Sequence, residues 1–547
     1  MARAQTVVSS PGKVLLAGGY LVLDPKHQGV VVSTSARFYT VVQHPDFAEG
    51  KEKEEGKSGG RGGGGGDEAP AIRIRVRSPQ FVDATWVYGV RIDGGKGTVE
   101  VEQLVDKDAT STKNKFVHTA LSRVLQLALE LEGEEGLRAR LGAGYDIVIA
   151  GDNDFYSQRA QLTARNLPPT LASLSQLPPF LHTGVQLSAV HKTGLGSSAA
   201  LITSLVSAIL LHLGIVPTDS FSPSSSTSST TSSTISSNIT ETESASSSSK
   251  ASDGRKLVHN TAQYVHCLAQ GKVGSGFDVA SAVFGSQLYT RFDPAVLQPL
   301  MDNDTSNSSS STLAHTLNAA WDYRVAPFRL PPQTRLMLAD VDAGSDTPSL
   351  VGKVLKWRKE NSAQADALWG ALDVLNQALA HALLGLSRMF EENAEEYAKV
   401  VKYLASLQSV QWLAHPAIPQ SETKVIEGFA EARRLSEGIR EKMREMGTLA
   451  GVPIEPPEQT ELLDACVGVA GVIGGGVPGA GGYDAIWVLV FEPASCADRA
   501  QLPSTRVESL WAAWKNLDVS PLAAAESTEG GVRVERVEDV SGLAGIL

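Results

Sequence analysis

A glycine–serine turn that runs straight into an apolar stretch limits the fold of this 547-residue chain more than any other segment. The stretch reads GLGSSAALITSLVSAIL from Gly194. Its glycines allow a tight backbone turn, Ser197 and Ser198 can cap a helix, and apolar side chains at helical spacing over 199–209 predict a core helix. The bare N–H groups of a helix N-terminus attract anions. The segment is therefore either a phosphate-binding loop or a plain turn that begins a core helix.

Composition and charge narrow the class of protein. Hydrophobic residues make up 42% and charged residues 20% of the chain, as in globular proteins. The net charge of -12 argues against nucleic acid or an anionic membrane as the main partner. Cys267, Cys466 and Cys496 lack metal or redox spacing, which favours a reducing compartment. The sequence shows no targeting pattern and no apolar run of about 18 residues, so we expect a cytoplasmic protein without membrane insertion.

Three low-complexity segments interrupt the folded pattern. They lack the apolar residues that would offset the entropy cost of ordering, so we expect disordered surface insertions at about 49–69, 219–252 and 302–312. Between them, the first half mixes Val- and Ile-rich strands with helices, and the second half is mainly helical and closes on a strand. We therefore predict two α+β domains, 1–330 and 331–547.

Several common catalytic patterns are absent from the sequence. GLGSSA lacks the terminal lysine of a nucleotide-binding P-loop, and no serine follows a strand in the GxSxG pattern of a hydrolase. His27, His191 and His266 have no Cys or carboxylate at metal spacing, so we interpret them as packing or surface histidines. These absences leave the glycine-rich segments as candidates for a functional site.

Three glycine-rich segments follow one another along the chain. SSPGKVLLAGGYLVLD begins at Ser9, KTGLGSSAAL at Lys192 and GGGVPGAGGYDAI at Gly474, and a GSGFD turn begins at Gly274. This ordered set resembles the GHMP kinase superfamily, small-molecule kinases named for galactose, homoserine, mevalonate and phosphomevalonate. Within it the sequence is most similar to phosphomevalonate kinases of the fungal and plant type, on further segments such as DVDAGSDTPSLVGKV and GVPIEPPEQTELLDA.

The resemblance implies a two-domain GHMP kinase fold of the α+β class. Its N-terminal part would be a ribosomal-protein-S5-like ATP-binding domain, and its C-terminal part a ferredoxin-like domain. ATP is implied as the co-substrate, with Mg²⁺ on Ser197 or Ser198 and catalytic roles for Lys13 and Asp278. The implied ATP-binding residues are Lys192, Gly194, Leu195, Gly196, Ser197, Ser198 and Ala199. The implied substrate-binding residues are Lys192, Tyr20, Arg37, Ser345, Thr347, Gly481 and Gly482.

One departure from the superfamily concerns the metal site. Mevalonate kinases usually carry a magnesium-binding glutamate shortly before the catalytic aspartate loop, whereas the corresponding stretch here, YVHCLAQGK, holds no carboxylate. Mg²⁺ tolerates few protein ligands and keeps several waters. We therefore expect a serine, ATP oxygens and water as its ligands.

A phosphorylated acceptor would explain the lysine before the loop. A phosphomonoester has a second pKa of about 6, so it meets the ATP γ-phosphate as a near-dianion and needs cations around it. Lys13, Lys192, Arg37 and Arg159 are the candidates, and Lys192 adjoins the loop. Because this acceptor has no proton to lose, we expect Asp278 either to orient Lys13 or a metal-bound water, or only to cap a helix.

The resemblance therefore implies ATP-dependent phosphorylation of 5-phosphomevalonate to the 5-diphosphate, a step of the mevalonate pathway of isoprenoid and sterol synthesis. The expected partners are these small molecules and no nucleic acid. Two alternatives stay open: a mevalonate kinase-like enzyme that phosphorylates an alcohol, and a catalytically silent GHMP-fold ligand sensor. The presence of Lys13 together with Asp278 speaks against the sensor.

Overall fold

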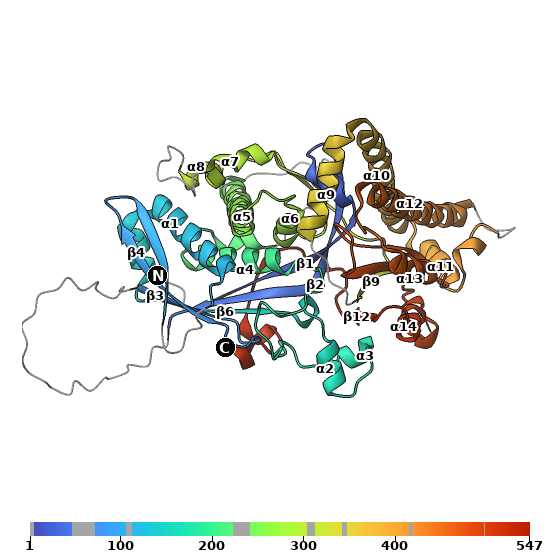
Figure 1. Cartoon of the computed structure of the whole chain (residues 1–547), viewed down its shortest axis with the longest axis horizontal. Coiled ribbons are helices and arrows are strands. Elements are labelled where there is room, and N and C mark those ends of the chain that lie inside the picture. Colours follow the sequence, from blue (N-terminus) through green and yellow to red (C-terminus); the bar gives the residue numbers. More distant parts are fainter. Residues whose placement is uncertain are drawn as a thin grey trace, which may run out of the picture.

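Two β-sheets with helices packed on them form the framework of the protein (Figure 1). The computed structural model describes residues 5–45, 72–105, 112–222, 241–302, 312–341, 347–414, 420–496 and 498–547. Within these residues no helix is long and apolar enough to cross a membrane.

The first sheet has the strand order β13-β1-β2-β6-β3-β4-β5, with β7 paired to β2 and β8 paired to β7. β3 and β6 run parallel, and the other pairs are antiparallel. The strands are β1 (Gln5–Ala17), β2 (Gln28–Gln43), β3 (Ile72–Arg77), β4 (Thr85–Asp93), β5 (Thr98–Leu104), β6 (Gly144–Gly151), β7 (Gln287–Thr290), β8 (Arg324–Pro327) and β13 (Arg533–Glu535).

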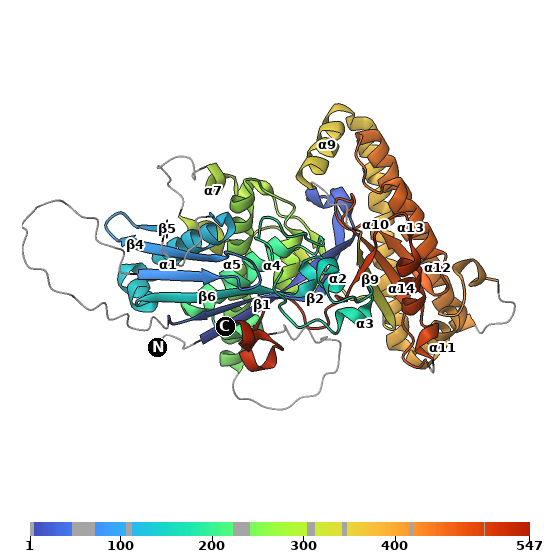
Figure 2. The ribbon, with the colours of Figure 1, turned by 60° about the horizontal axis from the view of Figure 1, so that its bottom comes forward.

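Helices cover one face of this sheet, as the turned view of Figure 2 shows. The predicted core helix is confirmed as α4 (Ser197–His212), whose side chains are buried against β1, β2 and the neighbouring helices. Those neighbours are α1 (Lys115–Leu141), α5 (Glu241–Gln270) and α6 (Phe277–Phe284). Shorter helices of the same region are α2 (Arg159–Ala164), α3 (Leu171–Leu174), α7 (Gln298–Asp302) and α8 (Leu313–Asn318).

The second sheet lies between two layers of helices. Its antiparallel order is β10 (Val472–Gly476), β11 (Ala485–Phe491), β9 (Thr334–Asp340) and β12 (Ser520–Leu522). Alternate residues of β9 and β11 pack into two different clusters, because successive side chains of a strand point to opposite faces. One face meets α10 (Ser362–Glu392), α11 (Ala394–Leu404) and α12 (Gln420–Ala450), and the other meets α13 (Pro457–Val467) and α14 (Pro503–Ala513). α9 (Thr347–Glu360) precedes these helices.

The chain crosses the predicted domain boundary a second time. Strands before residue 331 build the first sheet, but β13 returns to it and pairs with β1, with Val7 opposite Glu535 and Ser9 opposite Arg533. The C-terminal segment therefore belongs to the first sheet, although the sequence pattern assigned all of 331–547 to one domain.

The three predicted insertions overlap the described structure only in part. The expectation for 49–69 lies outside the described residues, as does that for 302–312 apart from its end residues. At the ends of 219–252, residues 219–221 belong to a 3-10 helix and 241–252 form the start of α5, so a disordered tract over the whole of this range is wrong. The sequence pattern did not indicate this helix, because its first turns are rich in serine and lack apolar residues at helical spacing.

Candidate active site

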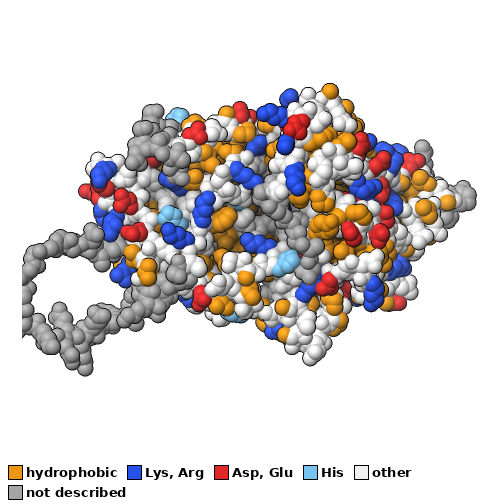
Figure 3. Space-filling model, viewed as in Figure 1, with side chains coloured by type: hydrophobic (Ala, Val, Ile, Leu, Met, Phe, Trp, Pro, Cys, Tyr) orange, Lys and Arg blue, Asp and Glu red, His pale blue; other side chains and the backbone are white. Residues whose placement is uncertain are grey.

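A cavity of about 380 Å³ brings the glycine-rich segments together. This volume lies within the usual range of small-molecule sites, about 300–1,000 Å³. Lys and Arg side chains gather around the middle of the face shown in Figure 3. The predicted site residues that line the cavity are Lys13, Tyr20, Lys192, Gly194, Gly196, Ser197, Ser198, Asp278 and Gly481.

The turn before α4 wraps around the side chain of Lys13. Gly194 and Gly196 have φ values of 78° and 77°, a left-handed conformation that favours glycine. A Cβ atom on Gly196 would lie 3.0 Å from Cε of Lys13. Leu195 and Ala199 are buried behind the turn and support it without lining the cavity. The glycines therefore bring backbone N–H groups and a lysine to one place.

Lys13 lies at a break in the β1–β2 register, between Pro11 and Lys13. Such an irregularity re-aims a side chain out of the sheet. The Lys13 ammonium donates to the carbonyl oxygen of Gly194 at 3.0 Å, and its backbone N–H donates to that of Leu195 at 2.9 Å. Burial lowers the pKa of Lys13, and the carboxylates of Asp278 and Asp484 oppose this effect.

Asp278 belongs to the first turn of α6. The N-cap position is taken by Gly276, at a φ of 86°. One carboxylate oxygen of Asp278 accepts from the N–H of Val279 at 3.0 Å, and the other lies 4.0 Å from Nε2 of His266. Asp278 therefore lines the cavity and also accepts a first-turn N–H of α6, although the N-cap position itself belongs to Gly276.

His266 is a site residue that sequence reasoning missed. Its side chain is 3% exposed, and its Nε2 lies 3.1 Å from both the Ser198 hydroxyl and Nε2 of Gln270. Burial lowers the pKa of His266, and Asp278 opposes this shift. The imidazole thus bridges Ser198 and the aspartate turn. The signal was its place in YVHCLAQGK, where a carboxylate was expected.

Lys192 lines the cavity from a backbone bridge with Tyr156. Its side chain is exposed, and desolvation by the neighbouring groups lowers the pKa of its ammonium. Lys272 and Asp484 also line the cavity, and neither was singled out from the sequence. The cavity wall thus carries three lysines and two carboxylates.

Tyr20, in the 3-10 helix after β1, and the segment 478–482, between β10 and β11, close the cavity from two sides. The Tyr20 hydroxyl donates to the carbonyl oxygen of Ala480 at 2.8 Å. Gly481 has a φ of 74°, and a Cβ atom there would lie 2.1 Å from the carbonyl oxygen of Ile454. Gly482 donates its N–H to that same oxygen at 2.9 Å and lies behind the wall.

Two predicted cations do not reach the cavity. Arg37 is 2% exposed and donates to the Ser9 hydroxyl at 2.7 Å and to the Gly531 carbonyl oxygen at 2.6 Å. Arg159 pairs with the carboxylate of Asp340 at 2.9 Å. Both therefore hold distant parts of the chain together, and their assignment to the acceptor pocket is wrong.

Two further predictions on the substrate side are not addressed by the geometry. Ser345 lies outside the described residues. Thr347 begins α9, and its side chain is likewise outside the description.

Oxygen donors near the loop suit a hard cation that keeps water ligands. The described side chains include no group of three or more His, Cys, Asp or Glu residues arranged for a metal. The hydroxyls of Ser197 and Ser198 and the carboxylate of Asp278 do line the same cavity. This donor set fits a magnesium ion that arrives with nucleotide phosphates.

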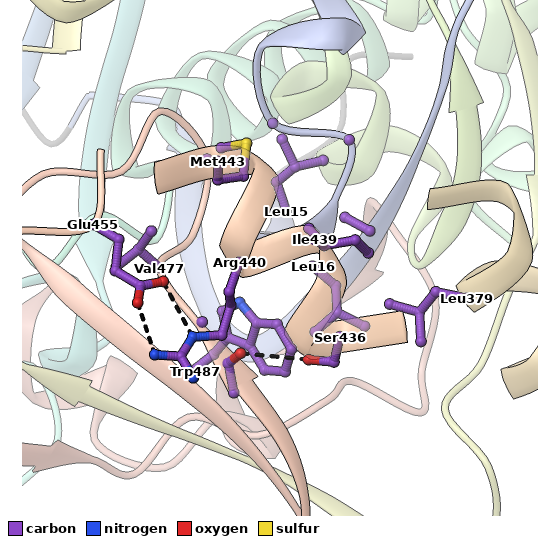
Figure 4. A pocket seen from close by; sticks show the side chains of 16 residues that line it. Leu15, Leu16, Leu379, Ser436, Ile439, Arg440, Met443, Glu455, Val477 and Trp487 are labelled. Carbon is purple, nitrogen blue, oxygen red and sulfur yellow. Dashed lines mark hydrogen bonds and ion pairs between the residues drawn. The ribbon is translucent and has the colours of Figure 1, made fainter. Parts of the chain in front are cut away.

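A smaller cavity is lined by Gly479 and by the side chains of Arg440 and Glu455 (Figure 4). Its volume is about 30 Å³, and Gly19 and Gly479 line it as well as the large cavity. On its wall, the Arg440 guanidinium donates to both carboxylate oxygens of Glu455, at 2.7 and 3.1 Å. Glu455 follows Ile454 in the chain. This buried ion pair therefore helps to fix the Ile454 carbonyl oxygen, which accepts a hydrogen bond from the Gly482 N–H.

Comparison with known proteins gives relatives along most of the chain. No family model matches the sequence. A peroxisomal phosphomevalonate kinase of Arabidopsis thaliana is 35% identical over 496 residues, which cover 88% of this chain and 89% of the relative. A phosphomevalonate kinase of Aspergillus fumigatus is 35% identical over 500 residues, which cover 89% and 87%.

A solved structure shares the fold. Streptococcus pneumoniae phosphomevalonate kinase in complex with phosphomevalonate and AMPPNP aligns with a TM-score of 0.51 and 13% identity, over 95% of this chain and 98% of that chain. The similarity covers both sheets, so the predicted α+β, two-domain fold is confirmed.

Proposed function

Because the chain belongs to the phosphomevalonate kinase family, we propose that it transfers the γ-phosphoryl group of ATP to 5-phosphomevalonate. The product is 5-diphosphomevalonate, an intermediate of isoprenoid and sterol synthesis in the mevalonate pathway. One observation carries the proposal: a single cavity joins the Gly194–Ser198 turn to Lys13, Lys192 and Asp278.

The reaction brings two anions together. A nonbridging oxygen of the acceptor phosphate attacks the γ-phosphorus, the bond to the β–γ bridging oxygen breaks, and ADP leaves with the electron pair. The acceptor phosphate is a near-dianion at neutral pH, since its second pKa is about 6. Lys13 and Lys192 supply positive charge inside a cavity where it is screened less than in water.

Each side chain then has a role that follows from charge. Lys13, held by the Gly194 carbonyl, binds the phosphoryl group in transfer. Lys192 binds the acceptor phosphate. Asp278 has no proton to remove from this acceptor, so it orients Lys13 and balances its charge. On the substrate side we also place Tyr20 and Gly481, and the proposal extends to Ser345 and Thr347.

Mg²⁺ would be held with ATP by the hydroxyl of Ser197 or Ser198, phosphate oxygens and water. When bound, it neutralises charge on the β- and γ-phosphates. His266 keeps the Ser198 hydroxyl in place on the wall of the cavity.

We further propose that the enzyme works in the cytoplasm. Its described cysteines are all free, which suits a reducing compartment. A fluorescent fusion expressed in the source cells tests this, and localisation in peroxisomes would overturn it.

A coupled assay of ADP release tests the activity. Phosphomevalonate should support turnover, and mevalonate should not, because an alcohol acceptor leaves the cations on the acceptor side unpaired. Turnover with mevalonate alone would indicate a mevalonate kinase. Absence of ADP release with either acceptor would favour a ligand sensor.

A further inference from the structure

Two side chains at the end of β7 hold the turn that precedes Asp278. Arg291 donates to the carbonyl oxygens of Val273 at 3.0 Å and Gly274 at 2.6 Å. Tyr289 donates its hydroxyl to the carbonyl oxygen of Ser275 at 2.9 Å. Tyr289 and Arg291 are 0% and 8% exposed, and they are two positions apart, so they lie on one side of the strand. Three consecutive carbonyl groups are thus fixed from behind.

The direction of the N–H groups follows from this arrangement. A trans peptide is planar, with C=O and N–H pointing in opposite directions. Carbonyl groups of Gly274 and Ser275 that point to β7 therefore direct the N–H groups of Ser275 and Gly276 away from it. Both residues line the cavity. Within the described part of the chain, neither N–H has a hydrogen-bond acceptor.

A buried amide side chain stands beside these N–H groups. Gln263 is 1% exposed and lines the cavity, and its Oε1 has no partner among the described residues. This oxygen lies 3.0 Å from the position that a Cβ atom on Gly276 would take, and Nε2 lies 3.2 Å from the Cys267 sulfur. Rotation of the amide by 180° presents its NH₂ group instead, with the thiol as donor to the oxygen.

We propose that Tyr289 and Arg291 are positioning residues that hold the N–H groups of Ser275 and Gly276, with Gln263, as a second anion-binding turn of the cavity. Its ligand is the phosphate of the acceptor. This inference rests on the proposed function, in which two phosphate groups meet in one cavity.

The position of the turn favours the acceptor over ATP. The Gly194–Ser198 turn already offers the N-terminus of the 16-residue helix α4 to one set of phosphates. The second turn leads directly into Asp278 and is bordered by Lys272. Arg291 also donates to the carbonyl oxygen of Leu23, in the segment that carries Tyr20, so one guanidinium braces two walls of the cavity.

Equilibrium binding separates the two ligands. Phosphomevalonate is titrated by calorimetry into protein saturated with a non-hydrolysable ATP analogue, and the analogue is titrated separately. Tyr289→Phe removes one hydroxyl and should weaken phosphomevalonate binding about tenfold, with the affinity for the analogue changed less than about twofold. Tyr145→Phe is the matched control, because the Tyr145 hydroxyl donates to the Arg140 carbonyl outside the cavity at 2.8 Å.

A second pair of variants guards against a folding defect. Arg291→Lys keeps the charge but cannot hold two carbonyl groups in a fork, so the KM for phosphomevalonate should rise about tenfold or more. Arg255→Lys is its control, since Arg255 donates to the carbonyl oxygens of Ser220 and Ser222 away from this site. Folded variants with unchanged affinity for phosphomevalonate, or with equal losses for both ligands, would overturn the inference. Failure of the wild type to bind phosphomevalonate would instead overturn the proposed function.

Discussion

At the scale of single residues, burial and opposite charge compete at Lys13. Burial favours the neutral amine, whereas Asp278 and Asp484 favour the ammonium. The two carboxylates thus favour the charged form of Lys13, in a cavity wall that must attract anions. At Lys192 desolvation lowers the pKa of the ammonium, so its charge depends more on the phosphate that it binds.

Replacing Lys192 tests its place on the acceptor side. Lys192→Met should raise the KM for phosphomevalonate about tenfold and lower turnover, while the KM for ATP changes little. Lys192→Arg should rescue only part of the loss, because a planar fork replaces a compact charge. Steady-state kinetics with each substrate varied, at several salt concentrations, check this. Equal losses for both substrates would move Lys192 to the nucleotide side.

Replacing Asp278 tests its orienting role. Asp278→Asn removes a charge but keeps the shape, so turnover should fall at least about a hundredfold while ATP still binds. Single-turnover kinetics and nucleotide titration make the comparison. A variant with near-normal turnover would contradict any role in the chemistry.

At the scale of elements, the segment 478–482 shows how two similar glycines differ in their surroundings. Gly479 and Gly481 both have positive φ values, of 67° and 74°. A Cβ atom on Gly479 would meet nothing within 4 Å, whereas one on Gly481 would collide with the Ile454 backbone. Their matched substitution therefore separates backbone strain from collision.

We expect Gly481→Ala to lose at least about tenfold in kcat/KM, because the segment must move away from Ile454 and from Tyr20. Gly479→Ala should pay only the strain of positive φ, about 1 kcal/mol in stability. Activity and thermal unfolding of the two variants give the test. Similar activities would show that the segment tolerates displacement.

Another prediction at this scale concerns Asp152, where β6 ends beside β2. Desolvation raises the pKa of Asp152 to about 7, against a hydrogen bond from the Arg37 N–H at 2.6 Å. The folded state therefore holds a proton that the unfolded state has lost, and the stability from this group falls as pH rises from about 4 to 7. Asp152→Asn should remove this loss, a gain of about 4 kcal/mol at pH 8 relative to pH 4. Melting temperatures across this range check it, and parallel curves for both proteins would contradict it.

At the scale of the whole molecule, the cavity depends on both sheets. Lys13 comes from the first sheet, Gly481 and Asp484 from the second, and Tyr20 joins them through Ala480. The chain passes from the first sheet to the second and then back, because the C-terminal strand β13 pairs with β1. Residues 223–240 belong to no described element of either sheet or of the cavity, so we expect them to be removable.

Deletions in the serine-rich tract test that expectation. Replacing 223–240 by a short Gly–Ser linker should leave ADP release within about twofold, because closure entropy changes only slowly with loop length. Extending the deletion to 252 removes the first turns of α5 and should lower the melting temperature. Circular dichroism and activity of both variants check this. Loss of activity in the shorter deletion would show that the tract shapes the site.

The sequence by itself determined the local features: the tight turn at Gly194, the helix after it, the ordered glycine segments and, through them, the family. These depend on neighbours along the chain, where spacing and residue type decide the conformation. Only the tertiary structure decided which charged groups meet. Arg37 donates to the carbonyl oxygen of Gly531, 494 positions along the chain, and so does not reach the cavity, whereas His266 and Lys272 line it. Such placements depend on burial and partners from other elements, which no local pattern contains.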